Sequence, residues 1–301
     1  MNLSNENTNP LNIQIVNAFI KDGQGGNPAG VVLNADDLTD TDMLSIAKKV
    51  GLSETAFVSA SNIAGFKLDF FTPNRRIAHC GHATIATFSY LASLGLVEDG
   101  ETSKETVDGP RKIILKEGAA FMEQLAPAYR NAKDWEKDGV TLDDVLTSLG
   151  LQEGDLAGDV EPFVVNTGNN FLVLGVKDQT ILQKLITRPN QITEISDKLD
   201  LIGYYIFTTQ TNTSDATTRM FAPRYEIAEE AATGMAAGPL ACVLYDHLNI
   251  KKDTFLIEQG EFMDTPSPSL ITVELNIKDG EIQNLMAGGY GKVMQNLKVT
   301  L

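Results

Sequence analysis

The stretch HATIATFSYLASL, from His82 to Leu94, decides the fold because it carries almost no charge on any face. A helix that is apolar around its whole circumference is surrounded by other elements rather than lying on a surface. A second stretch of the same kind, MAAGPLACVLYDH, runs from Met235 to His247. We therefore expect two central helices, each wrapped by its own strands.

The sequences that precede these two helices resemble each other. Phe71-Thr-Pro73 corresponds to Phe221-Ala-Pro223, and Cys80-Gly81 corresponds to Thr233-Gly234, about 150 residues later. The same order of strand, proline, loop, glycine and apolar helix thus occurs twice, which indicates a duplication at half the chain length. We expect an α+β fold of two pseudo-symmetric domains, each a curved, mainly antiparallel sheet or barrel wrapped around its apolar helix. A chance recurrence is the alternative.

The remaining local patterns extend this plan. Thr39 or Asp40 can cap a helix that runs to about Val50, and Gly51 suits the position after its end. Strand-like segments are 13–20, 29–33, 55–58, 66–71, 163–165, 171–176, 201–209 and 219–222, and a short helix is expected at 181–185. We expect a disordered tail at 1–10, a first domain at 11–126 and a second at 127–285. The last strand, about 286–301, is expected to complete the first domain.

Composition excludes several classes of function. The chain is 43% hydrophobic with a net charge of −16, so its averaged field repels nucleic-acid phosphates and anionic membrane surfaces. No signal segment and no apolar run long enough for a membrane span is visible, and only two cysteines occur. The glycine pairs lack the spacing of a dinucleotide fingerprint. We expect a cytoplasmic protein without nucleic-acid or membrane partners and without a cofactor.

Two glycines mark candidate anion sites. Gly81 and Gly234 each lie where a loop enters an apolar helix. The first backbone N–H groups of a helix have no partner within it, and the helix dipole is positive there. Such an end binds anions, so the two sites together suit a small carboxylate-bearing substrate. Tight helix starts without a ligand are the alternative reading.

Candidate proton carriers are expected around these helix starts. They are Glu54, His82 directly after Gly81, and the pair Glu229 and Glu230 before Thr233. General acid–base catalysis requires such groups. Glu54 falls in a neutral stretch, where desolvation raises the pKa of a carboxyl group towards neutrality. A surface turn at Glu54 is the competing interpretation.

Metal and thiol chemistry receive less support. His79, Cys80 and His82 are too crowded for all three to converge on an ion, and no remote cluster completes a shell, so we expect no metal. Cys80 at a helix start is a candidate thiol base. An epimerase that uses two thiols requires a second one at the matching place, where Thr233 stands instead.

Five short motifs, taken in order, resemble the phenazine-biosynthesis (PhzF-like) family. They are Gly26-Asn-Pro-Ala-Gly-Val-Val-Leu33, Leu52-Ser-Glu-Thr-Ala-Phe57, Phe71-Thr-Pro73, Cys80-Gly-His-Ala-Thr84 and Ala232-Thr-Gly234. The resemblance spans nearly the whole chain. It implies the diaminopimelate epimerase-like fold, an active site between the two domains, a homodimer, and isomerisation without a cofactor.

The resemblance also implies roles for particular residues. Glu54 matches the glutamate that moves the proton, and His82 matches its histidine helper. The family motif Glu-Asp-Pro-Ala-Thr-Gly-Ser is altered here, because Glu230 replaces the aspartate and Met235 replaces the serine. Residues expected around the substrate are Asn27, Ser53, Cys80, Gly81, Ala83, Thr233, Gly234 and Met235.

Together these features predict an isomerase with Glu54, His82 and Glu230 as its catalytic residues. Glu54 is expected to take a proton next to a conjugated or carboxyl-activated carbon and to return it elsewhere. The substitutions at Glu230 and Met235 leave open a non-catalytic protein that binds a small molecule. A third alternative is an epimerase that depends on Cys80.

Overall fold

The computed structural model describes residues 10–301, so all of the expected disordered tail except Pro10 lies outside the described residues. The chain divides into two units. The first unit comprises the described part of Met1–Met122 together with Gly288–Leu301, and the second is Glu123–Ala287. Among residues 10–301, no helix has both the length and the apolar character needed to cross a membrane.

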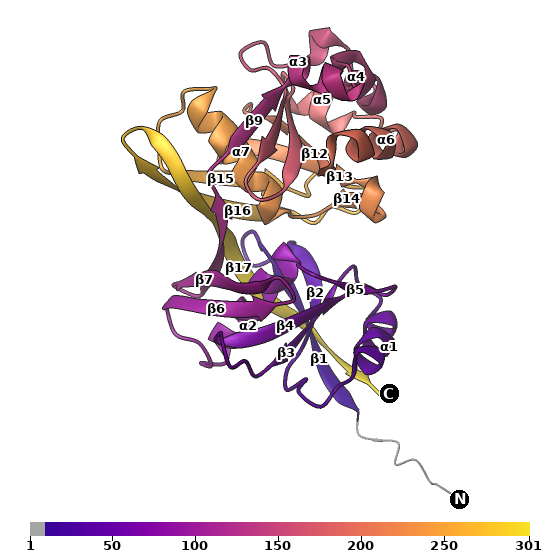
Figure 1. The fold of residues 1–301 in the computed structure, drawn as a ribbon, viewed down its shortest axis with the longest axis vertical. Coiled ribbons are helices and arrows are strands. Elements are labelled where there is room, and N and C mark those ends of the chain that lie inside the picture. The colour runs from indigo at the N-terminus through magenta and orange to yellow at the C-terminus, as the bar shows by residue number, and fades with distance from the viewer. Residues whose placement is uncertain (1–9) are drawn as a thin grey trace, which may run out of the picture. The chain divides into compact units, whose positions relative to one another are not determined.

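The first half of the chain contains strands around a single long central helix, with a second helix on the outside (Figure 1). Its elements are β1 (Leu11–Ala18), β2 (Asn27–Val32), α1 (Asp40–Val50), β3 (Thr55–Ser59), β4 (Phe66–Phe71), β5 (Arg76–Ile77), α2 (Gly81–Ser93), β6 (Gly100–Thr106), β7 (Gly109–Lys116) and β8 (Ala119–Leu125). The strands are joined mainly by antiparallel pairs, with parallel pairs at β2–β3 and β4–β6.

The second half repeats this order with more helices inserted. Its elements are β9 (Ala128–Asn131), α3 (Ala132–Trp135), α4 (Leu142–Leu149), β10 (Phe163–Asn166), β11 (Asn170–Gly175), α5 (Gln179–Gln183), α6 (Pro189–Leu199), β12 (Leu201–Thr208), β13 (Ala216–Ala222), β14 (Ile227–Glu230), α7 (Gly234–Asp246), β15 (Thr254–Gln259), β16 (Ser269–Lys278) and β17 (Glu281–Val299). Short 3₁₀ helices occupy Glu136–Asp138, Glu153–Asp155 and Pro223–Tyr225.

Strand pairing confirms the predicted duplication. In the first half β2 pairs parallel with β3, β3 antiparallel with β4, and β4 parallel with β6. In the second half β11 pairs parallel with β12, β12 antiparallel with β13, and β13 parallel with β15. Each central helix follows the short strand β5 or β14 in its half. The two halves therefore share one topology, which the recurring sequence motifs reflect.

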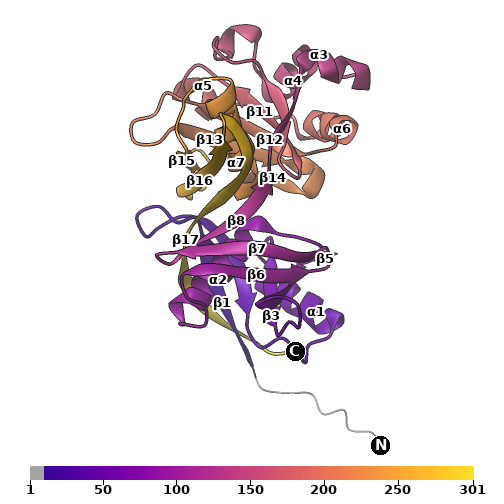
Figure 2. The same ribbon diagram turned by 60° about the vertical axis from the view of Figure 1, so that its left-hand side comes forward.

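Each half of the chain also pairs with a strand that lies outside its own repeat in the sequence. β17, at the end of the second repeat, pairs antiparallel with β1 from Leu11↔Val299 to Ala18↔Gly291 (Figure 2). β9, which follows the first repeat, pairs antiparallel with β10. The last strand was expected in the first domain, but no local pattern in the sequence names β1 as its partner or β10 as the partner of β9.

The two apolar helices are buried on all sides, as predicted. Every residue of α2 is buried except Tyr90, Ala92 and Ser93, and every residue of α7 is buried except Met235 and Asp246. Gly238 of α7 leaves room for β8, since a Cβ there would lie 2.3 Å from Gln124 Oε1. The predicted α+β fold with a central apolar helix in each half is confirmed.

The outer helix α1 begins and ends where the sequence indicated. Thr39 and Asp42 form a capping box, in which each side chain bonds the other residue's backbone N–H. Gly51 ends the helix with φ 70°, a left-handed conformation that glycine adopts without a steric penalty. The chain then turns through Ser53 into Glu54 and β3.

Candidate active site

Glu54 lies in the short connection between α1 and β3. Its carbonyl accepts a 3.0 Å hydrogen bond from Gly30 N–H, next to the start of the parallel pairing of β2 with β3. Position 30 suits only glycine, because a Cβ there would lie 2.8 Å from Thr55 Oγ1. The backbone of Glu54 is thus held by a sheet, and the residue is only 8% exposed.

The start of α2 faces this carboxylate. Cys80 is the N-cap residue, and Thr84 Oγ1 donates a 2.6 Å hydrogen bond to its carbonyl. Burial raises the pKa of the Cys80 thiol and outweighs the opposing effects of His82 and of the Ala83 backbone N–H. The thiol is therefore protonated at neutral pH. The Cys80 side chain makes no capping hydrogen bond to the first turn of α2, so the helix start is a candidate place for an anion.

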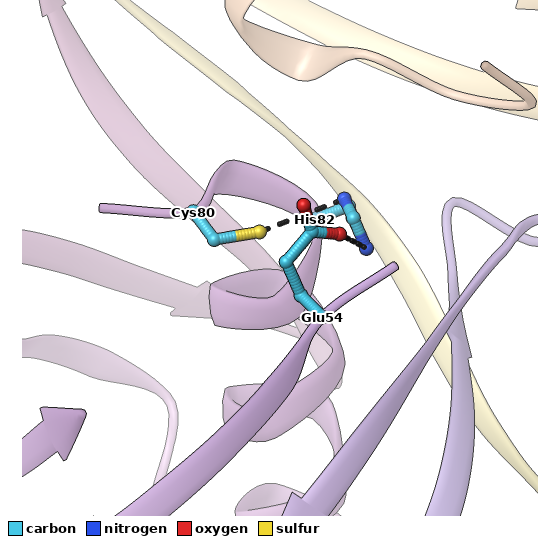
Figure 3. Close-up of side chains that lie close together, drawn as sticks. All are labelled: Glu54, Cys80 and His82. Carbon is cyan, nitrogen blue, oxygen red and sulfur yellow. Dashed lines mark hydrogen bonds and ion pairs between the residues drawn. The ribbon is translucent and has the colours of Figure 1, made fainter. Parts of the chain in front are cut away.

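Glu54, Cys80 and His82 come together in one buried cluster (Figure 3). His82 Nε2 lies 3.3 Å from Glu54 Oε2, and His82 Nδ1 lies 3.7 Å from Cys80 Sγ. One donor atom from each of the three residues lies within 4.8 Å of the others. The imidazole therefore stands between a carboxylate and a thiol, one at each ring nitrogen.

This arrangement suits proton transfer. A carboxylate accepts a proton, and an imidazole donates or accepts one at either nitrogen. His82 is 5% exposed, so solvent competes weakly for its contact with Glu54. The two-residue spacing alone places Cys80 and His82 close together. The contact of Glu54 with His82, in contrast, forms only in the folded chain.

A buried lysine supports the first turn of α2. Lys104 of β6 is 0% exposed, and its Nζ lies 2.6 Å from Thr84 Oγ1 and 3.2 Å from His79 Nδ1. Thr84 in turn donates to the Cys80 carbonyl. Burial lowers the pKa of Lys104 to about 7. His79 thus belongs to this supporting contact, while His82 belongs to the cluster with Glu54.

In the second unit, Glu230 lies at the corresponding helix start. Its Oε2 accepts a 2.5 Å hydrogen bond from Thr233 Oγ1, the N-cap residue of α7. Gln259 of β15 fixes this turn, because its Oε1 accepts from Thr233 N–H at 3.0 Å and its Nε2 donates to the Glu230 carbonyl at 2.6 Å. Tyr205 Oη also donates to Gln259 Oε1 at 3.0 Å. The Thr233 side chain makes no capping hydrogen bond to the first turn of α7, as is also the case for Cys80 in α2.

The neighbouring carboxylates of Glu229 and Glu230 have different surroundings. Glu229 forms a two-point ion pair with Arg219, at 2.8 Å from Nε and 2.7 Å from Nη2. Successive residues of β14 face opposite sides of the strand, so Glu230 turns towards Thr233 instead. Met235 lies half-buried in the first turn of α7, with Asn169 Nδ2 3.8 Å from its sulfur.

The other predicted site residues lie on the same elements. Asn27 is buried at the first position of β2, Ser53 is exposed directly before Glu54, and Gly81 and Ala83 are buried in the first turn of α2. Gly234 is buried at the first position of α7. The sequence did not single out Lys104 or Gln259, because a polar residue within a strand carries no local mark of burial.

Comparisons with known proteins identify the family and the fold of the chain. The family model of phenazine biosynthesis-like protein, PhzC-PhzF, matches residues 16–295. An uncharacterized isomerase of Clostridium acetobutylicum is 30% identical over 96% of this chain and 98% of its own length. The crystal structure of a PhzF-family protein of Bacillus anthracis has a TM-score of 0.85 at 24% identity, covering 97% of this chain and 99% of its own.

The fold also occurs in an enzyme of known substrate. A hydroxyproline epimerase of Agrobacterium vitis, solved with bound trans-4-hydroxy-L-proline, has a TM-score of 0.57 at 12% identity. The match covers 96% of this chain and 91% of the epimerase chain. At that identity the likeness concerns the fold alone.

Proposed function

Because the chain belongs to the PhzC-PhzF family of phenazine biosynthesis-like proteins, we propose that it is a cofactor-independent isomerase of a small carboxylate-bearing substrate. The buried contact between Glu54 and His82 carries this proposal. Its curated relative in Clostridium acetobutylicum is named an isomerase, which agrees with the reaction class.

Glu54 is the proton carrier in this proposal. Its carboxylate takes a proton from a carbon next to a conjugated or carboxyl-activated position, and the electron pair left behind is delocalised over that system. The resulting carboxylic acid returns the proton to a different carbon, so the substrate keeps its composition and Glu54 is regenerated. His82 holds the Glu54 carboxylate in place through the 3.3 Å contact.

The helix starts bind the substrate's negative charge. The N–H group at Gly81 of α2 and that at Gly234 of α7 are each a candidate donor for a carboxylate, and each helix dipole favours an anion at that end. Glu230 is the third candidate catalytic residue, and Thr233 fixes the position of its carboxylate within the second unit. Met235 gives this helix start an apolar side chain in place of a hydroxyl group.

Deuterium exchange tests the proposal. The native chain is incubated in heavy water with a panel of small unsaturated and amino carboxylic acids, and mass spectrometry records deuterium uptake. We expect exchange at a carbon-bound position of at least one acid, and its loss in Glu54→Gln. Glu98→Gln, which makes the same change at an exposed residue of the first unit, is the matched control and retains exchange.

Two results contradict this assignment. Exchange that continues at the native rate in Glu54→Gln removes Glu54 from the mechanism. Binding of a panel acid without exchange in the native chain favours the non-catalytic small-molecule-binding alternative.

A specific contact favours one second candidate, an epimerase that depends on Cys80. The Cys80 thiol lies 3.7 Å from His82 Nδ1 and is protonated at neutral pH, so it is a candidate proton donor on the other side of the ring. In that case Cys80→Ser abolishes exchange while Glu54→Gln retains it. The opposite pattern supports Glu54 and excludes this candidate.

A further inference from the structure

The two contacts of His82 give Cys80 a role other than that of a base. Cys80 Sγ lies 3.7 Å from His82 Nδ1, whereas Glu54 Oε2 lies 3.3 Å from Nε2, the other nitrogen of the ring (Figure 3). We propose that the Cys80 thiol donates a hydrogen bond to Nδ1 and thereby fixes the neutral His82 ring as the tautomer that carries its proton on Nε2. Cys80 is then a positioning residue, which acts on Glu54 through His82.

The thiol supplies the hydrogen for this bond. Burial raises the pKa of Cys80, so the thiol is protonated at neutral pH and has one S–H group to donate. Because sulfur is larger than oxygen or nitrogen, 3.7 Å from Sγ to Nδ1 is a hydrogen-bonding distance. A neutral imidazole has one acceptor nitrogen and one donor nitrogen. When Nδ1 accepts from the thiol, the ring proton is therefore on Nε2.

The carboxylate of Glu54 favours the same tautomer. An ionised carboxylate only accepts hydrogen bonds. In the opposite tautomer the lone pair of Nε2 would face Glu54 Oε2 at 3.3 Å, so two acceptors would repel each other. Nδ1–H would then have only the Cys80 sulfur, a weak acceptor, at the other edge of the ring. With the proton on Nε2, both contacts join a hydrogen to a good acceptor.

The helix start fixes the position of the thiol. Cys80 is the N-cap residue of α2, and its carbonyl accepts from Thr84 Oγ1 at 2.6 Å. Lys104 Nζ in turn donates to Thr84 Oγ1 at 2.6 Å. Cys80 is 6% exposed and His82 is 5% exposed, so water competes weakly for the contact between them. The thiol and the ring are thus held together before any substrate arrives.

The second half of the chain contains an internal parallel. Thr233, the N-cap residue of α7, stands at the place of Cys80 in the duplicated motif, and its hydroxyl donates to Glu230 Oε2. In each half the N-cap side chain is therefore a hydrogen donor to a candidate catalytic residue. Thr233 reaches its carboxylate directly, whereas Cys80 reaches Glu54 through an imidazole.

The consequence for catalysis rests on the function proposed above, in which Glu54 is the proton carrier. A neutral Nε2–H group orients the Glu54 carboxylate and places no net positive charge beside it. The carboxylate thus keeps its capacity to take up a proton and to return it.

Raman spectroscopy tests the thiol without any substrate. The S–H stretching band lies in a region free of other protein bands, and its frequency falls when the thiol donates a hydrogen bond. Cys242→Ala is the starting protein, because Cys80 is then its single thiol. We expect one S–H band at the frequency of a hydrogen-bonded thiol, and a shift to higher frequency when His82→Phe is added. Circular dichroism verifies that each variant is folded.

Nitrogen-15 NMR of protein with labelled histidine identifies the tautomer, because protonated and unprotonated ring nitrogens resonate in separate regions. The chain has three histidines, and the signals that His82→Phe removes belong to His82. At neutral pH we expect a protonated Nε2 and an unprotonated Nδ1. The Nδ1 signal is expected to move to higher frequency in Cys80→Ala, which has no donor. Cys80→Ser, whose hydroxyl also donates, is the matched control and keeps the signal close to its native position.

Three spectroscopic outcomes overturn the proposal. They are the absence of an S–H band, an S–H band that His82→Phe leaves in place, and a His82 ring that is protonated on Nδ1, whether as the other tautomer or as an imidazolium.

Deuterium exchange separates this inference from the proposed function. On that function, Cys80→Ala is expected to slow exchange by about 10- to 100-fold through misplacement of the Glu54 carboxylate, and Cys80→Ser is expected to restore most of the loss. An unchanged rate in Cys80→Ala, or abolished exchange in Cys80→Ser, overturns the positioning role. Absence of exchange in the native chain contradicts the isomerase proposal alone, because both spectra are recorded without substrate.

Discussion

Replacing Lys104 by methionine is expected to change how stability depends on pH. Lys104 is 0% exposed, and within residues 10–301 no carboxylate lies within salt-bridge distance of its Nζ. Its hydrogen-bonding neighbours are Thr84 and the neutral His79, and the charge of Arg111 adds to the effect of burial on its pKa. Burial lowers its pKa from 10.5 to about 7, so the folded protein holds this proton less tightly than the unfolded chain.

The sign of the effect follows from proton binding. Between pH 7 and pH 10.5 the unfolded chain keeps the Lys104 proton while the folded chain has lost it, so the stability of the native protein rises with pH. The greatest slope is about 1.4 kcal/mol per pH unit. Between pH 6 and pH 9 the contribution is thus on the order of 2–3 kcal/mol. Below pH 7 the amine is charged in both states, and its burial penalty is fully present.

Urea unfolding at pH 6 and pH 9, followed by circular dichroism, measures this contribution. Lys104→Met has no titrating group, so we expect the stability difference between variant and native protein to fall by about 2–3 kcal/mol from pH 6 to pH 9. Lys48→Met, at an exposed position of α1, is the matched control and leaves that difference constant. A Lys104→Met difference that is the same at both pH values, or that rises with pH, refutes the reasoning.

Two further predictions concern the second unit. Gln259→Leu leaves the Thr233 N–H and the hydroxyl of Tyr205 without their acceptor, so we expect a loss of about 2–4 kcal/mol in urea unfolding; an unchanged midpoint would show that water replaces the amide. Gly238→Ala places a Cβ 2.3 Å from a side-chain oxygen of β8 and is expected to destabilise by about 1–3 kcal/mol. Gly158→Ala, where nothing lies within 4 Å, is its control, and equal effects of the two would contradict the packing argument.

Much of the fold could be predicted because its main signal is local. The uncharged segments that became α2 and α7 differ from any surface helix in composition alone, and the duplicated motifs around them gave the topology of two similar halves. The last strand, about 286–301, was expected to complete the first domain, but the sequence did not show that its partner is β1. This pairing joins residues nearly 290 positions apart, and strand alternation does not name a partner.

The candidate site likewise has one part that the sequence predicts and one part that only the fold determines. Cys80 and His82 lie two positions apart, and spacing alone places them at one helix start. The contact of Glu54 with His82 was expected only from the family resemblance, because it depends on where β3 lies relative to α2. The different surroundings of Glu229 and Glu230 follow from strand alternation once β14 is known, but the sequence did not identify that strand.

The two helix starts have diverged in a way that bears on mechanism. At α2 the N-cap is a thiol beside a histidine and a buried carboxylate, with Lys104 behind it. At α7 the N-cap is a hydroxyl that donates to Glu230, within a network that Gln259 saturates. Within residues 10–301, a buried carboxylate contacts an imidazole at the start of α2 and not at the start of α7. On the function proposed above, this asymmetry favours Glu54 as the single group that both removes and returns the proton.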